Sequence, residues 1–462
     1  MNSLRIKDIS LVKESSNSGL KKTLGAMDLI LLGIGAVVGT GVFVLTGAAS
    51  QYAGPALVLS FLLSGFACLF VALVYTEIAS MIPTSGSVYS YSYVALGEFA
   101  AWMTSWFIIL EFAVGSTTVA AGWSGYFVDI LKQTGIMLPH SLTSTPSEGG
   151  IINLPAVFIA LFVTSILVRG TKESAMLNNI LVAVKIGAIF LFLAVAAPNF
   201  ELRHWENFAP NGFAGISTGA AVVFLAFIGF DSLATAAEEC KNPKRDITIG
   251  IIASLVICTI LYALIAAGLT GIVDYKELNN AKPLAYALGA IGKGKIAAIV
   301  AASAVAGMTT VILVQIYAQS RIFLAMARDG LLPKAFGKLH PKFGTPYIST
   351  IVIGSLVAIV SGLVPISILG NMANMGTLSV FIIASIVVMV LRKTAPDMER
   401  PFKCPLIHLV GAIAIISCGY LFLQLMPLVG KYYLIWSCLG VVIYFIYGYR
   451  ASNMNKANLN SL

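Results

Sequence analysis

The chain has 462 residues, of which 58% are hydrophobic and only 11% are charged. A soluble protein carries roughly 25% charged residues, so this composition excludes a soluble enzyme or binding module and indicates a polytopic membrane protein. The net charge of +9 is compatible with nucleic-acid binding, but its distribution along the chain indicates membrane topology instead. We therefore expect a lipid bilayer, and no nucleic acid, as a partner.

Twelve apolar runs are long enough to cross a bilayer, because about 20 residues span its hydrocarbon core. They fall at about 26–50, 55–80, 92–127, 151–169, 177–199, 214–238, 247–272, 298–327, 347–364, 371–391, 405–427 and 431–449. Residues 1–22 are polar, with neither an apolar core nor a small-residue cleavage site. The first run is therefore expected to act as the insertion signal.

The lysines and arginines between these runs define an orientation. Most of them fall in the N-terminal tail, the even-numbered connections and the C-terminal tail, which share one side of the membrane. Loops rich in lysine and arginine face the cytoplasm. We therefore predict that both termini are cytoplasmic and that the chain crosses the membrane twelve times.

Catalytic and metal-binding patterns are weak in this sequence. The six cysteines include no CxxC pair, and the four histidines form no cluster, so neither a disulfide framework nor a metal site is expected. Residues 215–219 match the GxSxG pattern of hydrolases but lack evident His and carboxylate partners. We predict that the protein is not an enzyme and has no cofactor.

The first apolar run contains the most informative segment, GIGAVVGTGVF at residues 33–43. Glycine is a weak helix former, and non-helical backbone at membrane depth is tolerated only where it lines a protein-enclosed cavity. Freed N–H groups and the positive end of the following half-helix together favour an anion. The segment therefore predicts a broken helix, with breaks at Gly39 and Gly41, that captures a small carboxylate.

Charged residues inside the apolar runs are costly and usually face a cavity or a partner. Glu77 and Asp231 lie near the ends of their runs, where a structural ion pair and a functional role are equally compatible with the sequence. Glu111 and Lys185 lie well inside theirs, which favours a functional role. The alternative for each is a structural ion pair.

A second break is predicted at Gly229, within LAFIGFD at residues 225–231. It lies five runs after the first break, as expected for two inverted repeats. The predicted fold is an all-α membrane protein with a 5+5 inverted repeat, broken helices 1 and 6 and two additional helices. Its parts are a cytoplasmic tail (1–22), repeat 1 (23–199), repeat 2 (214–391), spans 11 and 12 (392–449) and a second cytoplasmic tail (450–462).

Several motifs together resemble the amino acid–polyamine–organocation superfamily of permeases. They are GIGAVVGTGVF at 33–43, IPTSGSVYSYSY at 82–93, GFD at 229–231 with EE at 238–239 and KNP at 241–243, and ARDGLLP at 327–333. The resemblance extends from about residue 20 to residue 449. Within the superfamily, the chain resembles bacterial relatives of the cationic amino acid transporters.

The resemblance implies roles for individual residues. Val37, Thr40 and Gly41 match positions that meet the α-amino and α-carboxylate groups of the substrate. The carbonyls of Leu225, Ala226 and Ile228 match the opposite wall, and Glu111 matches an acidic residue of the pocket. Lys185 matches the lysine of proton-coupled members, where sodium-coupled relatives hold a sodium ion. A desolvated lysine can release and take up a proton.

Three positions depart from the family pattern. Leu225 stands where a bulky aromatic gate is frequent, Gln315 where an apolar residue is common, and 246–248 where a proline is usual. A polar amide at Gln315 can contact the substrate side chain or another helix. These departures affect the expected side-chain specificity and leave the expected transport function intact.

The resulting functional prediction is proton-coupled, sodium-independent uptake of cationic amino acids such as arginine and lysine. The first alternative is a proton-coupled permease for neutral or branched-chain amino acids, because similar permeases carry an acidic residue at the position of Glu111. A sodium-coupled carrier or an exchanger of the same fold is the further alternative. The expected location is a bacterial cell membrane, with the amino acid and a proton as ligands. The sequence defines neither the oligomeric state nor a small accessory membrane subunit.

Overall fold

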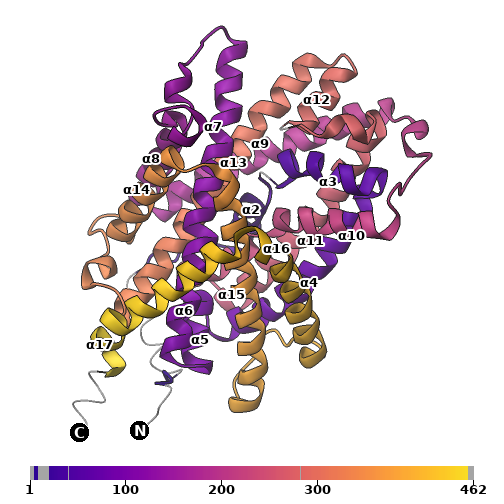
Figure 1. Cartoon of the computed structure of the whole chain (residues 1–462). Coiled ribbons are helices and arrows are strands. Elements are labelled where there is room, and N and C mark those ends of the chain that lie inside the picture. The colour runs from indigo at the N-terminus through magenta and orange to yellow at the C-terminus, as the bar shows by residue number, and fades with distance from the viewer. Residues whose placement is uncertain (1–4, 9–19, 40, 281, 456–462) are drawn as a thin grey trace.

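The computed structural model describes residues 5–8, 20–39, 41–280 and 282–455. The regular secondary structure in these ranges is helical, and the only extended pairings there are two isolated bridges, Leu24–Cys240 and Thr143–Asn153. The helices pack side by side in one bundle (Figure 1). Arg5 donates to Asn455 across 2.8 Å, so segments near both ends of the chain meet at one end of the bundle. We call this end the terminal face.

The first apolar run is a broken helix. Helix α2 (Ala26–Val37) ends at Val38, which has extended φ/ψ angles of −79° and 98°. The chain becomes helical again in the π-helical turn η1 (Gly41–Leu45) and continues as α3 (Thr46–Ala53). The predicted break at Gly39 thus lies between two short helices, each too short to cross a bilayer alone.

The sixth apolar run is also interrupted. Helix α10 (Gly212–Val223) and the 3₁₀ turn η8 (Phe224–Phe227) precede the break, and the 3₁₀ helix η9 (Phe230–Glu239) follows it. Gly229 adopts a φ of +126°, which only glycine accepts without strain. The predicted break therefore coincides with a residue whose backbone leaves helical geometry.

The two broken helices fit against each other through their glycines. A Cβ added at Gly41 would lie 2.3 Å from the Cα of Ala226, and one added at Gly229 would lie 2.9 Å from the carbonyl oxygen of Ala36. Both neighbours are backbone atoms that cannot move aside. Glycine is therefore needed at both breaks so that the two backbones can approach closely.

The remaining helices surround this pair. In chain order they are α4 (Leu57–Met81), α5 (Ser87–Ala95), α6 (Glu98–Ile108), η3 (Ile109–Val114), α7 (Gly115–Gln133), α8 (Leu154–Arg169), α9 (Thr171–Ala196), α11 (Pro243–Ile272), α12 (Pro283–Ala290), α13 (Gly294–Arg328), α14 (Tyr347–Leu363), α15 (Ile366–Thr394), α16 (Ile407–Ile443) and α17 (Tyr449–Ala451). Helices α5 and α17 lie at the terminal face, and α12 lies at the opposite end (Figure 1).

Helix α16 differs from the sequence-based expectation. The sequence predicts two separate spans at 405–427 and 431–449, whereas the structure continues in helical geometry through Pro427. Its two apolar arms, Ile407–Leu423 and Leu425–Ala451, diverge sharply in Figure 1. A proline inside a helix removes a hydrogen bond and kinks the axis, so a kinked helix joins the two predicted spans.

The helices have the length and composition of a polytopic membrane protein. Seven described helices are long and apolar enough to cross a membrane, and five shorter apolar helices complete the set. Each predicted apolar run overlaps one of these segments. The fold is therefore all-helical and polytopic.

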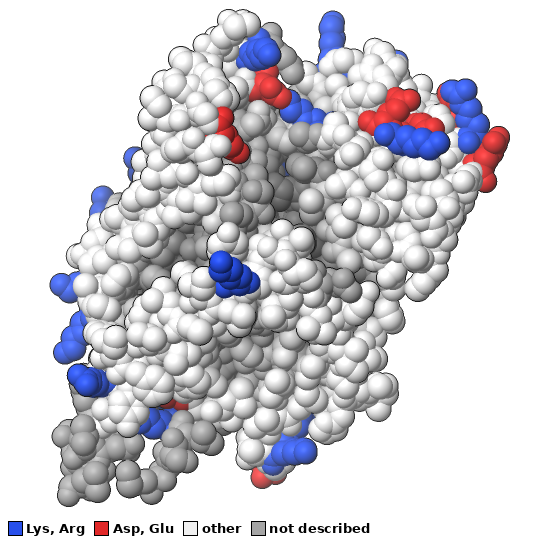
Figure 2. Space-filling view, in the orientation of Figure 1, with Lys and Arg blue, Asp and Glu red and all other residues white. Residues whose placement is uncertain are grey.

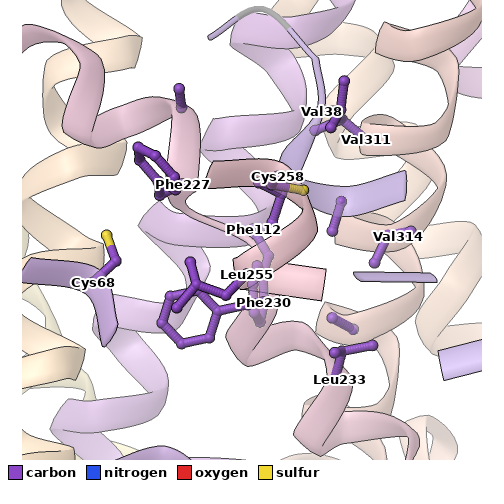
Figure 3. Close-up of a cluster of buried hydrophobic side chains, with 14 of the residues drawn as sticks. Val38, Cys68, Phe112, Phe227, Phe230, Leu233, Leu255, Cys258, Val311 and Val314 are labelled. Carbon is purple, nitrogen blue, oxygen red and sulfur yellow. The ribbon is translucent and has the colours of Figure 1, made fainter. Parts of the chain in front are cut away.

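The apolar core includes the residues that flank the second break. The ring of Phe227 lies 5.2 Å from that of Tyr262, and the ring of Phe230 lies 5.6 Å from that of Phe381. Figure 3 shows Phe227 and Phe230 in one cluster with Leu255. Aromatic contacts of this kind hold both halves of the broken helix in place.

Glu77, one of the four charged residues inside the apolar runs, forms a buried ion pair. Its carboxylate accepts from Arg392 at 2.6 and 2.7 Å, lies 3.3 Å from Arg400 and accepts from the backbone N–H of Cys404 at 2.8 Å. This cluster connects α4 to the end of α15 and the start of α16. For Glu77, the structural ion pair is thus the alternative that the structure supports.

Candidate functional site

A cavity of about 310 Å³ lies where the two broken helices meet α7, α13 and α15. Pockets for small ligands are typically roughly 300–1,000 Å³, so this one suits a compact molecule. Figure 2 shows the molecule hollowed in its upper half, between the parts that carry α7 and α3. The lining residues are Ala36, Val37, Gly39, Gly41, Leu45, Glu111, Gly115, Thr118, Val119, Gly122, Ile228, Val311, Gln315, Gly370, Asn371, Ala373, Asn374 and Thr377.

Five of the predicted substrate-binding residues line this cavity: Val37, Gly41, Glu111, Ile228 and Gln315. They come from four of the predicted apolar runs, so the fold brings together positions up to 278 residues apart in the sequence. Thr40, also predicted, lies outside the described residues, and so does the side chain of Leu225.

Ala226 is placed differently from the other predicted wall residues. It is absent from the described cavity lining, and its carbonyl accepts a hydrogen bond from the hydroxyl of Tyr262 at 3.0 Å. The same hydroxyl lies 2.9 Å from the carbonyl oxygen of Val37. Tyr262 on α11 thus bridges carbonyls beside the two breaks.

Glu111 lies in a π-helical turn, η3, in the middle of the third apolar run. Such turns interrupt a helix and are frequent at functional sites. The side chain is 2% exposed, and among the described residues neither carboxylate oxygen has a hydrogen-bond partner. Asp231 is the neighbouring charged group, and its Oδ1 likewise lacks a partner among those residues. Two buried carboxylates thus lie together beside the cavity.

Lys185 on α9 contacts the end of α2 at the first break and is not among the described residues that line the cavity. Its fully buried ammonium donates to the carbonyls of Ile34, Gly35 and Val38 at 3.0, 3.1 and 2.8 Å, and lies 2.9 Å from the hydroxyl of Thr310. An ammonium has three N–H donors, so these acceptors satisfy it without a carboxylate. All three carbonyls lie on the N-terminal side of Gly39, because Ile34 and Gly35 belong to the last turn of α2 and Val38 follows its end.

Gln315 contributes an amide to the cavity wall. Its Oε1 accepts from the hydroxyl of Ser116 at 3.1 Å, and a Cβ added at Gly115 would lie 3.1 Å from its Nε2. Of the two roles that the sequence left open, contact with another helix is therefore seen, while the side chain also lines the cavity.

Helix α15 supplies polar residues that the sequence analysis missed. Asn371, Asn374 and Thr377 line the cavity and follow each other at intervals of three, which places them on one helical face. That periodicity is visible in the sequence and could have marked the tenth run as a cavity wall. Tyr262 gave no comparable signal, because a single tyrosine in an apolar run is common.

Paired charges connect the helical segments of the terminal face. Arg321 donates to Glu239 at 2.7 Å, and both are fully buried. Arg328 donates to Glu238 at 2.9 Å, and that carboxylate also accepts from the hydroxyl of Ser85 at 2.8 Å. These contacts join η9, which follows the second break, to α13 and the start of α5.

Comparison with known proteins agrees with this geometry. The sequence profile of the amino acid permease family matches residues 24–446. The chain belongs to this family. The resemblance to the amino acid–polyamine–organocation superfamily is thereby confirmed. The family consists of transporters, so this permease is a transport protein of a membrane.

Three relatives illustrate the range of substrates in the family. This permease is 45% identical over 447 residues to the branched-chain amino acid permease BcaP of Bacillus subtilis, covering 96% of each chain. It is 42% identical over 450 residues to the methylthioribose transporter of the same organism, covering 97% of this chain and 98% of the other. Identity to the chloroplastic cationic amino acid transporter 9 of Arabidopsis thaliana is 38%, over 71% of this chain and 59% of the other.

These similarities change the substrate prediction. The expected cationic preference finds less support than its first alternative, because the branched-chain permease matches at higher identity and over nearly the whole chain. An acidic pocket residue such as Glu111 can pair with the side chain of a lysine or arginine substrate. In the structure, this carboxylate has a second carboxylate beside it, which makes it a poor indicator of substrate charge.

Proposed function

We propose that this permease is a secondary active, proton-coupled and sodium-independent carrier of neutral amino acids with branched side chains. The observation that carries the proposal is the buried Lys185, held by carbonyls of the last turn of α2 and of Val38 where the first break begins. Its charge occupies the place where a sodium ion would otherwise be needed. The ammonium thereby disfavours the sodium-coupled alternative by direct repulsion.

The cavity lining supports a neutral, apolar side chain. Leu45, Val119, Ile228 and Val311 offer aliphatic groups, and no lysine or arginine lies among the described lining residues. A pocket that is mostly apolar with a few well-placed polar groups suits a small ligand with one polar end. A branched side chain would pack against the aliphatic wall.

The polar end of the substrate is expected at the breaks. The second half of the first broken helix begins at Gly41, and the N-terminal end of a helix favours a carboxylate. Val37 and Thr40 complete the expected carboxylate and amine site, with the carbonyls of Leu225, Ala226 and Ile228 opposite. Because Ile228 lines the cavity and Ala226 is not among the described lining residues, the carbonyl of Ile228 is the preferred ammonium acceptor.

Coupling to protons is assigned to Lys185. When charged, the ammonium ties the end of α2 at the first break to α9 and, through Thr310, to α13. Loss of the proton removes at least one of these donors and loosens the contact, which favours opening toward the terminal face. Alternating access in folds with inverted repeats rocks one bundle against another around a fixed site, so a contact at a break can bias both states.

Glu111 is assigned to the coupling machinery instead of to a cationic side chain. Its carboxylate and that of Asp231 repel each other when both are ionised. A proton shared between them would relieve that repulsion without any cationic substrate. Glu111 would then influence every substrate alike.

The proposed topology has twelve membrane spans, with 23–199 and 214–391 as inverted repeats and 392–449 as the added pair. The tails 1–22 and 450–462 are placed in the cytoplasm, which makes the terminal face the inner face of a bacterial cell membrane. The excess of lysine and arginine in the segments of that side supports this orientation.

A second candidate substrate is methylthioribose, which the 42% identical relative is named for. The amides of Gln315, Asn371 and Asn374 in the cavity lining suit the hydroxyl groups of a sugar. A sugar lacks the carboxylate that the breaks favour, so we rank it second.

The test is uptake into proteoliposomes of leucine, isoleucine, valine, arginine, lysine and methylthioribose, each under a proton gradient or a sodium gradient. We expect accumulation of the branched-chain amino acids under the proton gradient alone. Preferential accumulation of arginine or lysine would restore the cationic prediction. Accumulation that follows the sodium gradient would contradict the proposed role of Lys185.

A further inference from the structure

A second cavity, of about 670 Å³, lies at the terminal face between the end of α15 and the start of α16. Its lining includes Arg392, Lys403 and His408, together with Leu406 and Leu409. No aspartate or glutamate belongs to its described lining. The cavity shares no described lining residue with the transport site.

The electrostatic balance around this cavity is positive. Glu77 is the carboxylate within reach of Arg392, and it also faces Arg400 at 3.3 Å, so two guanidinium charges meet one carboxylate. Lys403 adds an exposed ammonium. The nearby Glu399 pairs with Lys244 on α11. A surplus of positive charge in a cavity attracts an anion.

The cavity is continuous with an apolar surface. Leu406 is 76% exposed and Leu409 is 57% exposed. Farther along the first arm of α16, Ile416 and Leu423 are 70% and 66% exposed. Leu409, Ile416 and Leu423 recur at intervals of seven and so share one helical face. Such an apolar stripe contributes nothing to the binding of a soluble anion, whereas an acyl chain can pack against it.

We propose that this cavity binds the phosphate headgroup of an anionic phospholipid in the leaflet at the terminal face. Lys403, His408 and Arg392 would contact the headgroup, and an acyl chain would lie along the stripe formed by Leu409, Ile416 and Leu423. Basic pockets between membrane helices are suited to this class of ligand. The proposal is independent of which substrate the permease carries.

Occupation of the site has a structural consequence. Arg392 also holds Glu77 on α4 and the carbonyl of Cys404, so the headgroup would lie against the cluster that ties α4 to α15 and α16. A ligand that binds only the folded state stabilises it by mass action. The lipid would therefore raise the thermal stability of the purified protein.

The test compares the full-length protein in neutral detergent with added phosphatidylglycerol, phosphatidylcholine or inorganic phosphate. Lipid retention is measured by native mass spectrometry, and stability by the thermal unfolding midpoint. We expect phosphatidylglycerol to be retained and to raise the midpoint, with the other two additives much weaker. The variant Lys403→Gln should weaken retention about fivefold, given roughly 1 kcal/mol per basic residue near an anionic surface.

The matched control is Lys393→Gln, which removes an exposed lysine from the last turn of α15 but outside the cavity lining. It should retain phosphatidylglycerol like the unmodified protein. Equal loss in both variants would reduce the effect to general surface charge and overturn the proposal. Equal stabilisation by phosphatidylcholine would overturn it as well, because the site would then not require a net negative charge. Equal stabilisation by inorganic phosphate would also overturn it, because the site would then not require an acyl chain. The midpoint of each variant without lipid verifies that it is folded.

Discussion

Buried charged groups at the terminal face have charged or hydroxyl partners, whereas those beside the transport cavity have no partner of opposite charge among the described residues. At the terminal face, buried carboxylates accept from arginine, lysine, tyrosine or serine side chains, as in Glu98, Glu238, Glu239 and Asp329. Beside the cavity, Glu111 and Asp231 lack a cationic partner among the described residues, and Lys185 has only neutral acceptors. Paired charges hold helices together, while unpaired charges can change their protonation state.

The largest effect is expected from breaking the buried pair of Glu239 and Arg321 at the terminal face. Glu239→Gln leaves the fully buried Arg321 without its counter-charge, which costs about 3–5 kcal/mol when a buried pair loses one partner. We expect a strong loss of folded protein in thermal unfolding monitored by size-exclusion chromatography. The double variant Glu239→Leu/Arg321→Met removes both charges and should recover much of the loss. A single variant as stable as the original would show that this pair does not hold η9 to α13.

The next effect concerns the close contact of the two breaks. Gly41→Val would place branched carbons against the backbone of Ala226, where even a Cβ lies at 2.3 Å. Overpacking of this kind costs about 1–3 kcal/mol or more, so we expect reduced folded yield as well as lost substrate binding. Gly125→Val in α7 serves as the control, because an added Cβ there meets nothing within 4 Å. Normal yield and affinity in Gly41→Val would mean that the breaks are farther apart than described.

The glycines in the first and sixth apolar runs predict both breaks, because glycine is a weak helix former and accepts backbone conformations outside the helix. The sequence also marks Lys185 and Glu111, because charge at membrane depth is rare. It does not foresee the 3₁₀ geometry of η9, the helical passage through Pro427 or the bridge from Tyr262 to Val37 and Ala226. Those features depend on tertiary packing between distant segments, and no local pattern encodes them.

A smaller effect is expected for the unpaired carboxylate. If Glu111 serves coupling, Glu111→Gln should lower proton-driven uptake of leucine and of alanine by the same factor, about tenfold for a contribution of roughly 1.4 kcal/mol. Competition by arginine should remain as weak as in the original protein. Selective loss of arginine transport in this variant would instead return Glu111 to the recognition of cationic side chains.

A still smaller steric effect is expected at the cavity wall. Gly115→Ala adds a methyl group 3.1 Å from Nε2 of Gln315 and narrows the cavity. We expect the apparent affinity for isoleucine to fall more than that for alanine, by about threefold to tenfold, since one methyl group in an apolar pocket is worth roughly 1 kcal/mol. An equal loss for both substrates would place Gly115 away from the substrate side chain.

The smallest effect is expected for a pair at the surface. Lys244 and Glu399 lie 2.6 Å apart and are 55% and 74% exposed. Exposed pairs contribute about 0–1 kcal/mol, so Lys244→Gln should leave the unfolding midpoint and uptake nearly unchanged. A large loss in this variant would contradict the view that only the buried pairs secure the terminal face.

The most direct test of the account is leucine transport by Lys185→Met in proteoliposomes. The substitution keeps the length of the side chain and removes its titratable group. We predict that exchange of labelled for unlabelled leucine persists at equal pH on both sides, while accumulation driven by an inward proton gradient is abolished. Accumulation that still follows the proton gradient in this variant would contradict the assignment of coupling to Lys185.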